Sequence, residues 1–494
     1  MSGDLKGRTL RGGLAKLCGQ AANFILRFGY IMILARLLSP DDFGLVAMVT
    51  VVTGVYEIFT SAGLSSAMIQ QATISSDQIS KLFWANLLFG VVLSILCVAT
   101  APVLVMFFNE PRLLWVTIAM APTFLLGAAS VQHMAILQRE LRYITVAIIE
   151  LVALIASIAV GIGMAMTGYG YWAIVGAALT IQAVTAIGAF AVTRWVPGRF
   201  SSSTEIGPML WFGATMCFNS LVAYVAYNFD KLLIGRVWGA DALGLYGRAY
   251  QLINIPILNL NLSIGGVAFA ALSRLQHDPE RLKSYFLKGY SLVVSITIPV
   301  AIFCGVFSLE IVTTVLGSQW IDAAQIFRLL SPTILIFAVI NPLSWLLYAI
   351  GKHRRSLHIA LVLMPILIGA YFIGLPYGPN GVAAAFSIAM ALWIVPMVTW
   401  CLHGTKISPK DLIVVVGRPL LSGLIAAAIA LGVQLYVSDI FKLPAILELA
   451  VGGGAMVLVY GAVLLFALNQ RHFYLDLIRG LKSRPSSESY GPAE

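Results

Sequence analysis

A short polar stretch occurs twice in the chain, and this recurrence limits the possible folds more than any other feature. Residues 34–45 read LARLLSPDDFGL and residues 234–245 read IGRVWGADALGL. Four residue types recur at a constant offset of 200, as Arg36, Asp41, Gly44 and Leu45 in the first copy and Arg236, Asp241, Gly244 and Leu245 in the second. Each copy lies between two long apolar runs, as expected of a turn joining two membrane helices. The chain is therefore predicted to contain two copies of one helical bundle.

Two further landmarks follow the same repeat. Ala121-Pro122-Thr123 matches Ser331-Pro332-Thr333, and Gly168 matches Gly378, both at an offset of 210. Six apolar runs separate the equivalent turns, and because six is even, both halves enter the membrane from the same side. The sequence thus predicts parallel repeats, related by an axis along the membrane normal.

Composition identifies the class of protein. Of the 494 residues, 60% are hydrophobic and 11% are charged, whereas soluble domains carry about 25% charged residues. A polytopic membrane protein is therefore predicted. The five cysteines are scattered singly through apolar sequence, without a CxxC pair or a nearby histidine at metal spacing. We interpret them as buried apolar residues and expect neither a metal site nor a cofactor.

Fourteen apolar runs are long enough to span a membrane. The first follows Lys16 and continues to about residue 35, and the others cover about 43–68, 82–108, 113–137, 145–166, 171–194, 208–235, 243–272, 285–316, 325–350, 357–375, 380–402, 411–436 and 445–468. The predicted fold is all-α, with about 14 transmembrane helices in two parallel six-helix lobes and two extra C-terminal helices. The predicted boundaries are 1–205 for the N-lobe, 206–406 for the C-lobe, 407–470 for helices 13 and 14, and 471–494 for a cytoplasmic tail.

Lysine and arginine are distributed unevenly over the predicted loops. With the N-terminus inside, the cytoplasmic tails and loops hold 22 of them, and the opposite loops hold only Arg36, Arg112, Arg236 and Lys442. Because short cytoplasmic loops retain basic residues during insertion, both termini are predicted to be cytoplasmic. This bias explains most of the net charge of +10 without a nucleic-acid partner.

Several classes of enzyme are excluded by missing motifs. The chain has no GxxxxGK[ST] phosphate loop, since its only Gly-Lys pair, Gly351-Lys352, is followed by His353. The pair Asp41-Asp42 resembles the external carboxylates of membrane glycosyltransferases. However, Ser39-Pro40-Asp41-Asp42 also has the form of a helix N-cap with carboxylates in the first turn, and Ala242 replaces Asp42 in the second copy. A structural cap is therefore favoured over catalysis.

Ionisable residues inside the predicted spans are few, and each is a candidate for function because charge in hydrocarbon is costly without a partner or cavity. Arg27 is expected near mid-membrane, roughly 14 Å from the first turn at helical rise. Glu57 is expected at a similar depth on the next helix, within reach of pairing with Arg27. Glu150 lies near the start of the fifth span.

The second half contributes three more charges, Asp230 and Lys231 at the outer end of the seventh span and Arg248 in the first turn of the eighth. For Asp230 and Glu150, an ion pair that only fixes helix packing is an equally good interpretation. For Arg27 and Arg248 a functional role is favoured, because the two cations fall on the opening helices of different lobes. Aromatic residues near span ends, such as Tyr224 and Trp238, are typical of interface anchors.

The run GRTLRGGLAKLCGQAANFILRFGYIMILARLLSPDDFGLVAMV, with its echo FDKLLIGRVWGADALGLYGRAYQL, resembles the polysaccharide transporter branch of the multidrug/oligosaccharidyl-lipid/polysaccharide exporters. Within that branch the likeness is to bacterial exporters of colanic acid and succinoglycan repeat units. The resemblance runs nearly end to end, and the doubled turn is its most specific part.

This resemblance implies a flippase of the bacterial cytoplasmic membrane that serves exopolysaccharide synthesis. Its substrate would be an undecaprenyl-diphosphate-linked oligosaccharide, moved from the inner to the outer leaflet by alternating access. In the related lipid II flippases, cationic cleft residues hold the diphosphate, and Arg27 matches by position the arginine of their first helix. Such a role suggests a polysaccharide polymerase and co-polymerase as partners.

Physical chemistry favours the same assignment, since a cleft with Arg27, Lys231 and Arg248 would suit a diphosphate. Arg248 is placed in the cleft by depth, not by motif. A drug or cation antiporter of the same superfamily is the alternative, and it would have a carboxylate-rich cleft and twelve spans. Glu57, Asp230 and Glu150 are candidates for ion coupling or for ion pairs that fix packing.

Overall fold

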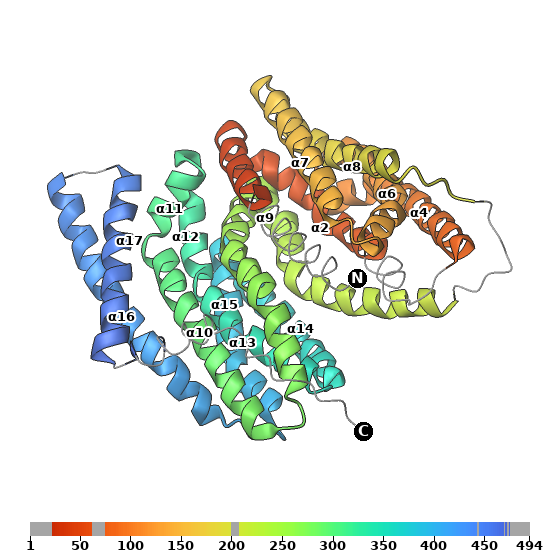
Figure 1. Ribbon diagram of the computed structural model, residues 1–494. Helices are drawn as coiled ribbons and strands as arrows, with labels where there is room; N and C mark the ends of the chain where they lie inside the picture. Colours follow the sequence, from red (N-terminus) through yellow and green to blue (C-terminus); the bar gives the residue numbers. More distant parts are fainter. Residues whose placement is uncertain are drawn as a thin grey trace, which may run out of the picture. The chain divides into compact units, whose positions relative to one another are not determined.

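The computed structural model describes residues 22–61, 75–198, 207–441 and 444–468, together with residues 470, 471 and 474 (Figure 1). Within those ranges the chain is helical and contains no strand. A first helix covers residues 22–37. It is followed by α2 (Pro40–Ser61), α4 (Ser76–Phe108), α5 (Leu113–Met120), α6 (Pro122–Arg139), α7 (Tyr143–Met166), α8 (Trp172–Thr193), α9 (Gly207–Arg274), α10 (Pro279–Val306), α11 (Ser308–Val315), α12 (Ile321–Leu330), α13 (Pro332–Ala349), α14 (His353–Gly374), α15 (Gly378–Leu402), α16 (Pro409–Phe441) and α17 (Ala445–Ala462).

Ten segments of the described chain are long and apolar enough to cross a membrane. One of them, Arg354–Leu402, contains both α14 and α15, which the sequence predicts as two spans. Likewise, α9 is interrupted at Gly239, where φ is 82°, between the predicted seventh and eighth spans. The all-α polytopic class is confirmed, and the number fourteen stays a prediction.

The two halves share local structure at the positions where their sequences match. Pro122 begins α6 and Pro332 begins α13, so each proline divides an apolar run into two helices. The following threonine donates its hydroxyl to the carbonyl three residues earlier in both copies, Thr123 to Met120 at 2.5 Å and Thr333 to Leu330 at 2.6 Å. Gly168 and Gly378 both adopt positive φ, 83° and 73°, which explains glycine at these positions.

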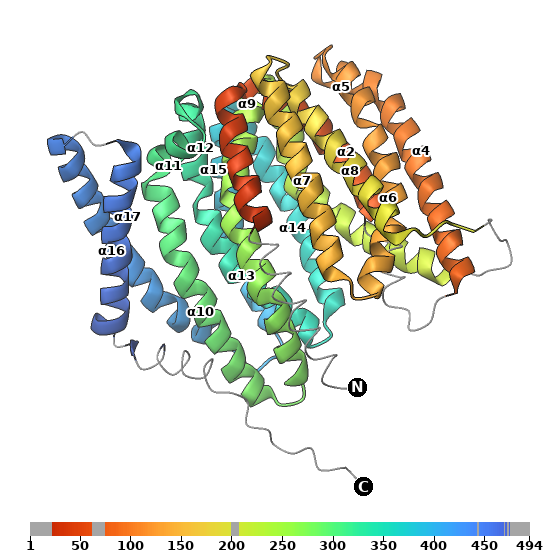
Figure 2. The ribbon, with the colours of Figure 1, turned by 45° about the horizontal axis from the view of Figure 1, so that its top comes forward.

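The chain forms two compact units, and the first comprises residues up to Leu252 with Val315–Ile326 and Leu357–Met390. In this unit α4 packs against α6, and α6 and α7 pack against α8 (Figures 1 and 2). Small residues allow the close approach, as expected of membrane helices. A Cβ on Gly90 would lie 2.5 Å from that of Ala128.

The second unit comprises Ile253–Thr314, Phe327–Ser356 and residues from Ala391 onward. Here α10 packs against α13, α16 and α17, and α16 packs against α17 (Figure 2). Glycines mediate these contacts too, since a Cβ on Gly452 would lie 2.4 Å from the Phe307 ring. The lobe boundaries predicted from the repeat stay a prediction.

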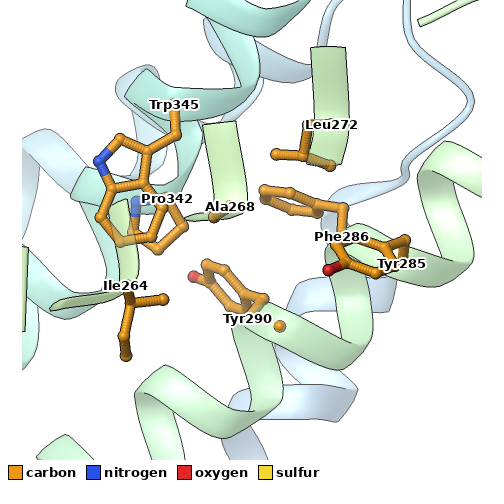
Figure 3. Close-up of a pocket in the computed structure, with 9 residues that line it drawn as sticks. Ile264, Ala268, Leu272, Tyr285, Phe286, Tyr290, Pro342 and Trp345 are labelled. Carbon is orange, nitrogen blue, oxygen red and sulfur yellow. The ribbon is translucent and has the colours of Figure 1, made fainter. Parts of the chain in front are cut away.

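A small apolar cavity lies inside the second unit, between α9, α10 and α13 (Figure 3). Its volume is about 30 Å³, and Ile264, Tyr290 and Trp345 are among the residues that line it. The Tyr290 hydroxyl points into it and has no hydrogen-bond partner among the described residues. The cavity therefore sets a buried hydroxyl against a mainly apolar lining.

Candidate functional site

The two copies of the repeated turn pack directly against each other within the first unit. A Cβ on Gly44 would lie 1.7 Å from the carbonyl oxygen of Ala240, and a Cβ on Gly244 would lie 1.9 Å from that of Pro40. Pro40 and Ala240 are themselves equivalent at the offset of 200, so the contact is reciprocal. Only glycine permits so close an approach of two backbones, which is why the repeat keeps glycine at both positions.

Aromatic side chains reinforce this contact. Trp320 is fully buried, donates its indole N–H to the carbonyl of Ala35 at 2.7 Å and packs on the Phe43 ring at 5.5 Å. Gln319 donates to the carbonyl of Leu38 at 3.0 Å. The first turn is therefore held from two sides, by the second turn and by residues 319–320.

A cavity of about 350 Å³ lies next to the packed turns. It lies between α2 and the two parts of α9 that precede and follow the interruption at Gly239. From α2 it is lined by Phe43, Ala47, Thr50, Val51, Gly54 and Glu57, and from α9 by Tyr224, Asn228, Lys231, Leu243, Gly244, Gly247 and Arg248. Phe43, Leu243 and Gly244 belong to the turns or directly follow them. The packed turns thus close the cavity at that end.

Lys231 is positioned by a chain of hydrogen bonds along α9. Its Nζ donates to Asn228 Oδ1 at 2.7 Å, and Asn228 Nδ2 donates to the carbonyl of Tyr224 at 2.9 Å. The ammonium also lies 4.5 Å from the centre of the Tyr250 ring, a cation–π arrangement. The Tyr224 hydroxyl donates to the carbonyl of Val51 at 2.9 Å, which joins this chain to α2.

Arg248 lies in the part of α9 that follows Gly239, whereas Lys231 lies in the part that precedes it. Its guanidinium stacks 3.8 Å from the centre of the Phe43 ring and donates a hydrogen bond to Gln251. The guanidinium forms no ion pair with a carboxylate among the described residues. Arg248 therefore brings a cation into the cavity whose other donors can serve an anionic ligand.

Asp230 is 1% exposed and does not line the cavity, although it is adjacent to Lys231 in sequence. Its carboxylate accepts hydrogen bonds from the Tyr246 hydroxyl at 2.6 Å and from the Lys231 backbone N–H at 2.8 Å. The rings of Tyr246 and Tyr250 stack at 6.1 Å beside it. Asp230 thus fixes the part of α9 that carries Lys231.

The structure brings some of the predicted site residues together and leaves others apart. Lys231, Arg248 and Glu57 share the cavity, whereas Arg27 is exposed and is not among its lining residues. Arg27 and Glu57 form no ion pair in the described part of the chain. Glu150 is exposed on α7, away from the cavity lining. The roles assigned to these residues from sequence stay predictions.

The pair Asp41-Asp42 has structural partners. Asp42 accepts hydrogen bonds from the Ser39 backbone N–H at 3.0 Å and from the Ser39 hydroxyl at 2.7 Å, while Ser39 Oγ accepts from the Asp42 N–H at 3.3 Å. This reciprocal arrangement is a capping box at the start of α2. Asp42 also accepts from the Tyr171 N–H at 2.9 Å. The cap predicted from the sequence is confirmed.

Asp41 forms an ion pair with Arg112, whose Nη1 lies 2.7 Å from Asp41 Oδ2. Arg112 also donates to Glu110 at 2.8 Å, and these hydrogen bonds lower the pKa of the Glu110 carboxyl. No cluster of metal-ligating side chains occurs among the residues that the structure describes. The Asp41 carboxylate is therefore engaged in holding the loop between α4 and α5.

We expect Asp42→Asn to leave transport close to the wild-type level. Loss of the carboxylate weakens a cap worth about 1 kcal/mol, and the amide oxygen can still accept one of the hydrogen bonds. The measurement is polymer production together with the amount of membrane-inserted protein. Complete loss of polymer at a normal protein level would restore the catalytic interpretation of the acidic pair.

The sequence matches one protein-family model, described as "Polysaccharide biosynthesis protein", over residues 33–325. That match covers more than half of the chain. The chain belongs to this family.

Two relatives named for polysaccharide biosynthesis or transport also match the sequence. Lipopolysaccharide biosynthesis protein WzxC of Escherichia coli (strain K12) is 26% identical over 403 residues, which cover 80% of each protein. Succinoglycan biosynthesis transport protein ExoT of Rhizobium meliloti (strain 1021) is 22% identical over 312 residues, 63% of each protein. The resemblance to exporters of the polysaccharide transporter branch is thereby confirmed.

A solved structure of the lipid II flippase MurJ in an inward closed conformation has the same fold. It superimposes with a TM-score of 0.74 and 17% identity, covering 95% of this chain and 100% of that one. The chain therefore shares the fold of that flippase, and its ten membrane-length apolar segments in the described residues make it a multi-pass membrane protein. The predicted fold class is confirmed.

Sequence reasoning missed most of the residues that position the two cavity cations. Phe43 and Tyr246 carry no charge, so a search for ionisable residues passes over them. Tyr224, interpreted from the sequence as an interface anchor, lines the cavity and donates a hydrogen bond to α2. The one available signal was the loss of symmetry at the repeat, where Phe43 is matched by Leu243 and Arg248 by Met48.

Proposed function

We propose that this protein is a flippase that moves a lipid-diphosphate-linked oligosaccharide repeat unit across the bacterial cytoplasmic membrane. The observation that carries the proposal is the cavity in which Lys231 and Arg248 converge. A chain with 11% charged residues places two cations beside one cavity between apolar helices. Their cost is offset when an anionic ligand binds there.

The geometry suits a diphosphate in particular. Lys231 provides a point charge and Arg248 a planar fork, and these two kinds of donor bind phosphate oxygens in complementary ways. The cavity volume of about 350 Å³ falls at the low end of the usual range for small-molecule sites. It accommodates the diphosphate and the nearest sugar, with the lipid tail left among the membrane helices.

The proposal also fits the closed end of the cavity. The reciprocal glycine contact and Trp320 seal the side that the distribution of basic loop residues assigns to the periplasm. A ligand would then reach the cations from the cytoplasmic side and leave only after the turns separate. We extend the proposal to alternating access of lobes 1–205 and 206–406, with cytoplasmic termini and with a polymerase and co-polymerase as downstream partners.

Arg27 keeps a place in this proposal as a second contact for the diphosphate, made in another state of the transport cycle. Its exposed side chain is available for such a contact. Glu57, which lines the same cavity as the two cations, is the candidate for coupling transport to an ion gradient. This carboxylate is also the observation that favours the alternative, an ion-coupled antiporter for small molecules.

The proposal is tested by removing the protein from cells that make the polymer. We expect the lipid-linked oligosaccharide to accumulate, accessible to periodate in inside-out vesicles and protected in right-side-out vesicles. Restoring the wild-type chain should return polymer export and clear the accumulated lipid. An unchanged lipid pool with altered sensitivity to toxic cations would instead support the antiporter.

A further inference from the structure

The loop between α13 and α14 gathers basic side chains at the surface of the second unit. It reads Gly351-Lys352-His353-Arg354-Arg355, and α14 begins at His353 with no acidic residue in its first turn. The positive end of the helix dipole disfavours cations at this end of a helix. The positive charges of this segment are therefore stabilised neither by the dipole of α14 nor by an acidic residue in its first turn.

Of these residues, Arg355 has a structural role. Its Nη1 donates to the carbonyls of Trp400 at 3.2 Å and His403 at 2.6 Å, at the end of α15. Terminal helix carbonyls are commonly satisfied by basic side chains in this way. Arg355 thus fixes the α13–α14 loop to the end of α15.

Lys352 lies close to the Arg355 guanidinium. It is half-buried, and its Nζ lies 3.4 Å from the position of a Cβ on Gly404. Burial, and then the neighbouring Arg355 charge, lower the pKa of the Lys352 ammonium. Arg354 is exposed in the first turn of α14.

Three acidic residues lie at the starts of α10 and α16, and all three pair with other cations. Asp278 pairs with Arg281 at 3.3 Å, Glu280 with Lys406 at 2.8 Å and Asp411 with Lys283 at 2.6 Å. Across the described residues, no carboxylate lies within ion-pair distance of Lys352 or Arg354. Within the described part of the chain, the charge of these two residues is therefore not neutralised.

The internal repeat supplies a matched comparison. Leu141 and Gly351, equivalent at the offset of 210, both adopt positive φ, 57° and 72°, so the two loops share this backbone turn. Arg142 stands at the position of Lys352, and it pairs with Glu140 at 3.5 Å. In the second half Ile350 replaces that glutamate. The cation that follows the positive-φ residue is thus paired with a carboxylate in the first half, whereas its counterpart in the second half has no such partner among the described residues.

We propose that Lys352 and Arg354 bind the phosphate group of a membrane lipid at this surface. The proposal depends on the membrane location of the chain and not on the transport function. Basic clusters next to a membrane helix attract anionic head groups, and each lysine or arginine raises the affinity about fivefold. Two lipids carry the required chemistry, an anionic phospholipid and a polyprenyl diphosphate, and the experiment separates them.

The test uses the full-length protein in phosphatidylcholine nanodiscs to which phosphatidylglycerol or undecaprenyl diphosphate is added, with lipid binding measured by native mass spectrometry. Lys352→Gln should lower the apparent affinity about fivefold, and addition of Arg354→Gln should lower it further. Ile350→Glu should also weaken binding, because it introduces the carboxylate of the first half without removing a cation. Arg142→Gln is the matched control and should bind as wild type does.

Weakened binding of both lipids would support a general phosphate site. Weakened binding of undecaprenyl diphosphate alone would support a site for the carrier lipid. Wild-type binding of both lipids by Lys352→Gln and by the double variant would overturn the proposal and leave the cluster a role in membrane orientation only. Thermal unfolding of each variant separates lost binding from misfolding, and Lys352→Gln, whose half-buried side chain lies beside Gly404, is the variant expected to fold normally.

Discussion

Replacement of Arg248 by methionine should reduce export at least about 100-fold while the protein still inserts into the membrane. A hydrogen bond to a charged group contributes about 1.5–3 kcal/mol, and Arg248 can offer two such bonds to a phosphate. Methionine is the residue that the first repeat carries at the equivalent position, Met48, which is buried there. The variant therefore keeps side-chain volume and removes the charge. Export is measured as polymer per amount of inserted protein.

Two companion variants make this prediction specific. Arg248→Lys should recover part of the activity, because it keeps the charge and loses the two-pronged geometry. Arg236→Met is the control, since Arg236 is an exposed cation of the same helix that stacks near Phe107, outside the cavity. It should export at close to the wild-type rate. Normal export by Arg248→Met at normal protein level would remove Arg248 from the substrate site.

Substitution of either repeated glycine should open the closed end of the cavity. A Cβ on Gly44 or Gly244 would lie within 2 Å of a backbone carbonyl oxygen, which cannot be relieved by rotating a side chain. The turns must separate, so Gly44→Ala and Gly244→Ala should each lose most export. Because both changes separate the same pair of turns, the double variant should be no worse than either single one.

The separation is measured by labelling a cysteine at Thr50, an exposed lining residue of the cavity, in a background without the native cysteines. A membrane-impermeant thiol reagent added from the periplasm should label it in the glycine variants and not in the parent. Gly163→Ala is the control, because a Cβ on Gly163 of α7 meets no atom within 4 Å. Equal protection of Thr50→Cys in all variants would show that the turns do not form the closure.

The repeat, the class and most helix boundaries follow from the sequence, because they depend on local physics. Membrane spans need long apolar runs, so helices such as α7 and α8 begin and end within a few residues of the predicted limits. Glycine at 168 and 378, and proline at 122 and 332, mark backbone geometry that few other residues adopt. The cap at Asp42 could be predicted for the same reason, since its capping partner Ser39 lies three residues away.

Only the tertiary structure decided which charges share a cavity. The sequence offered Arg27, Lys231 and Arg248 as cations of one cleft. It also offered Arg27 and Glu57 as a possible pair, without fixing the direction in which each side chain points. That direction depends on how each helix is rotated about its axis, and rotation is set by packing partners distant in sequence. Phe43 against Arg248, Tyr224 against Val51 and Trp320 against Ala35 are such partners, separated by more than 170 residues in each case. The sequence by itself determined the repeat and its turns, and the packing of uncharged side chains between distant helices decided the site.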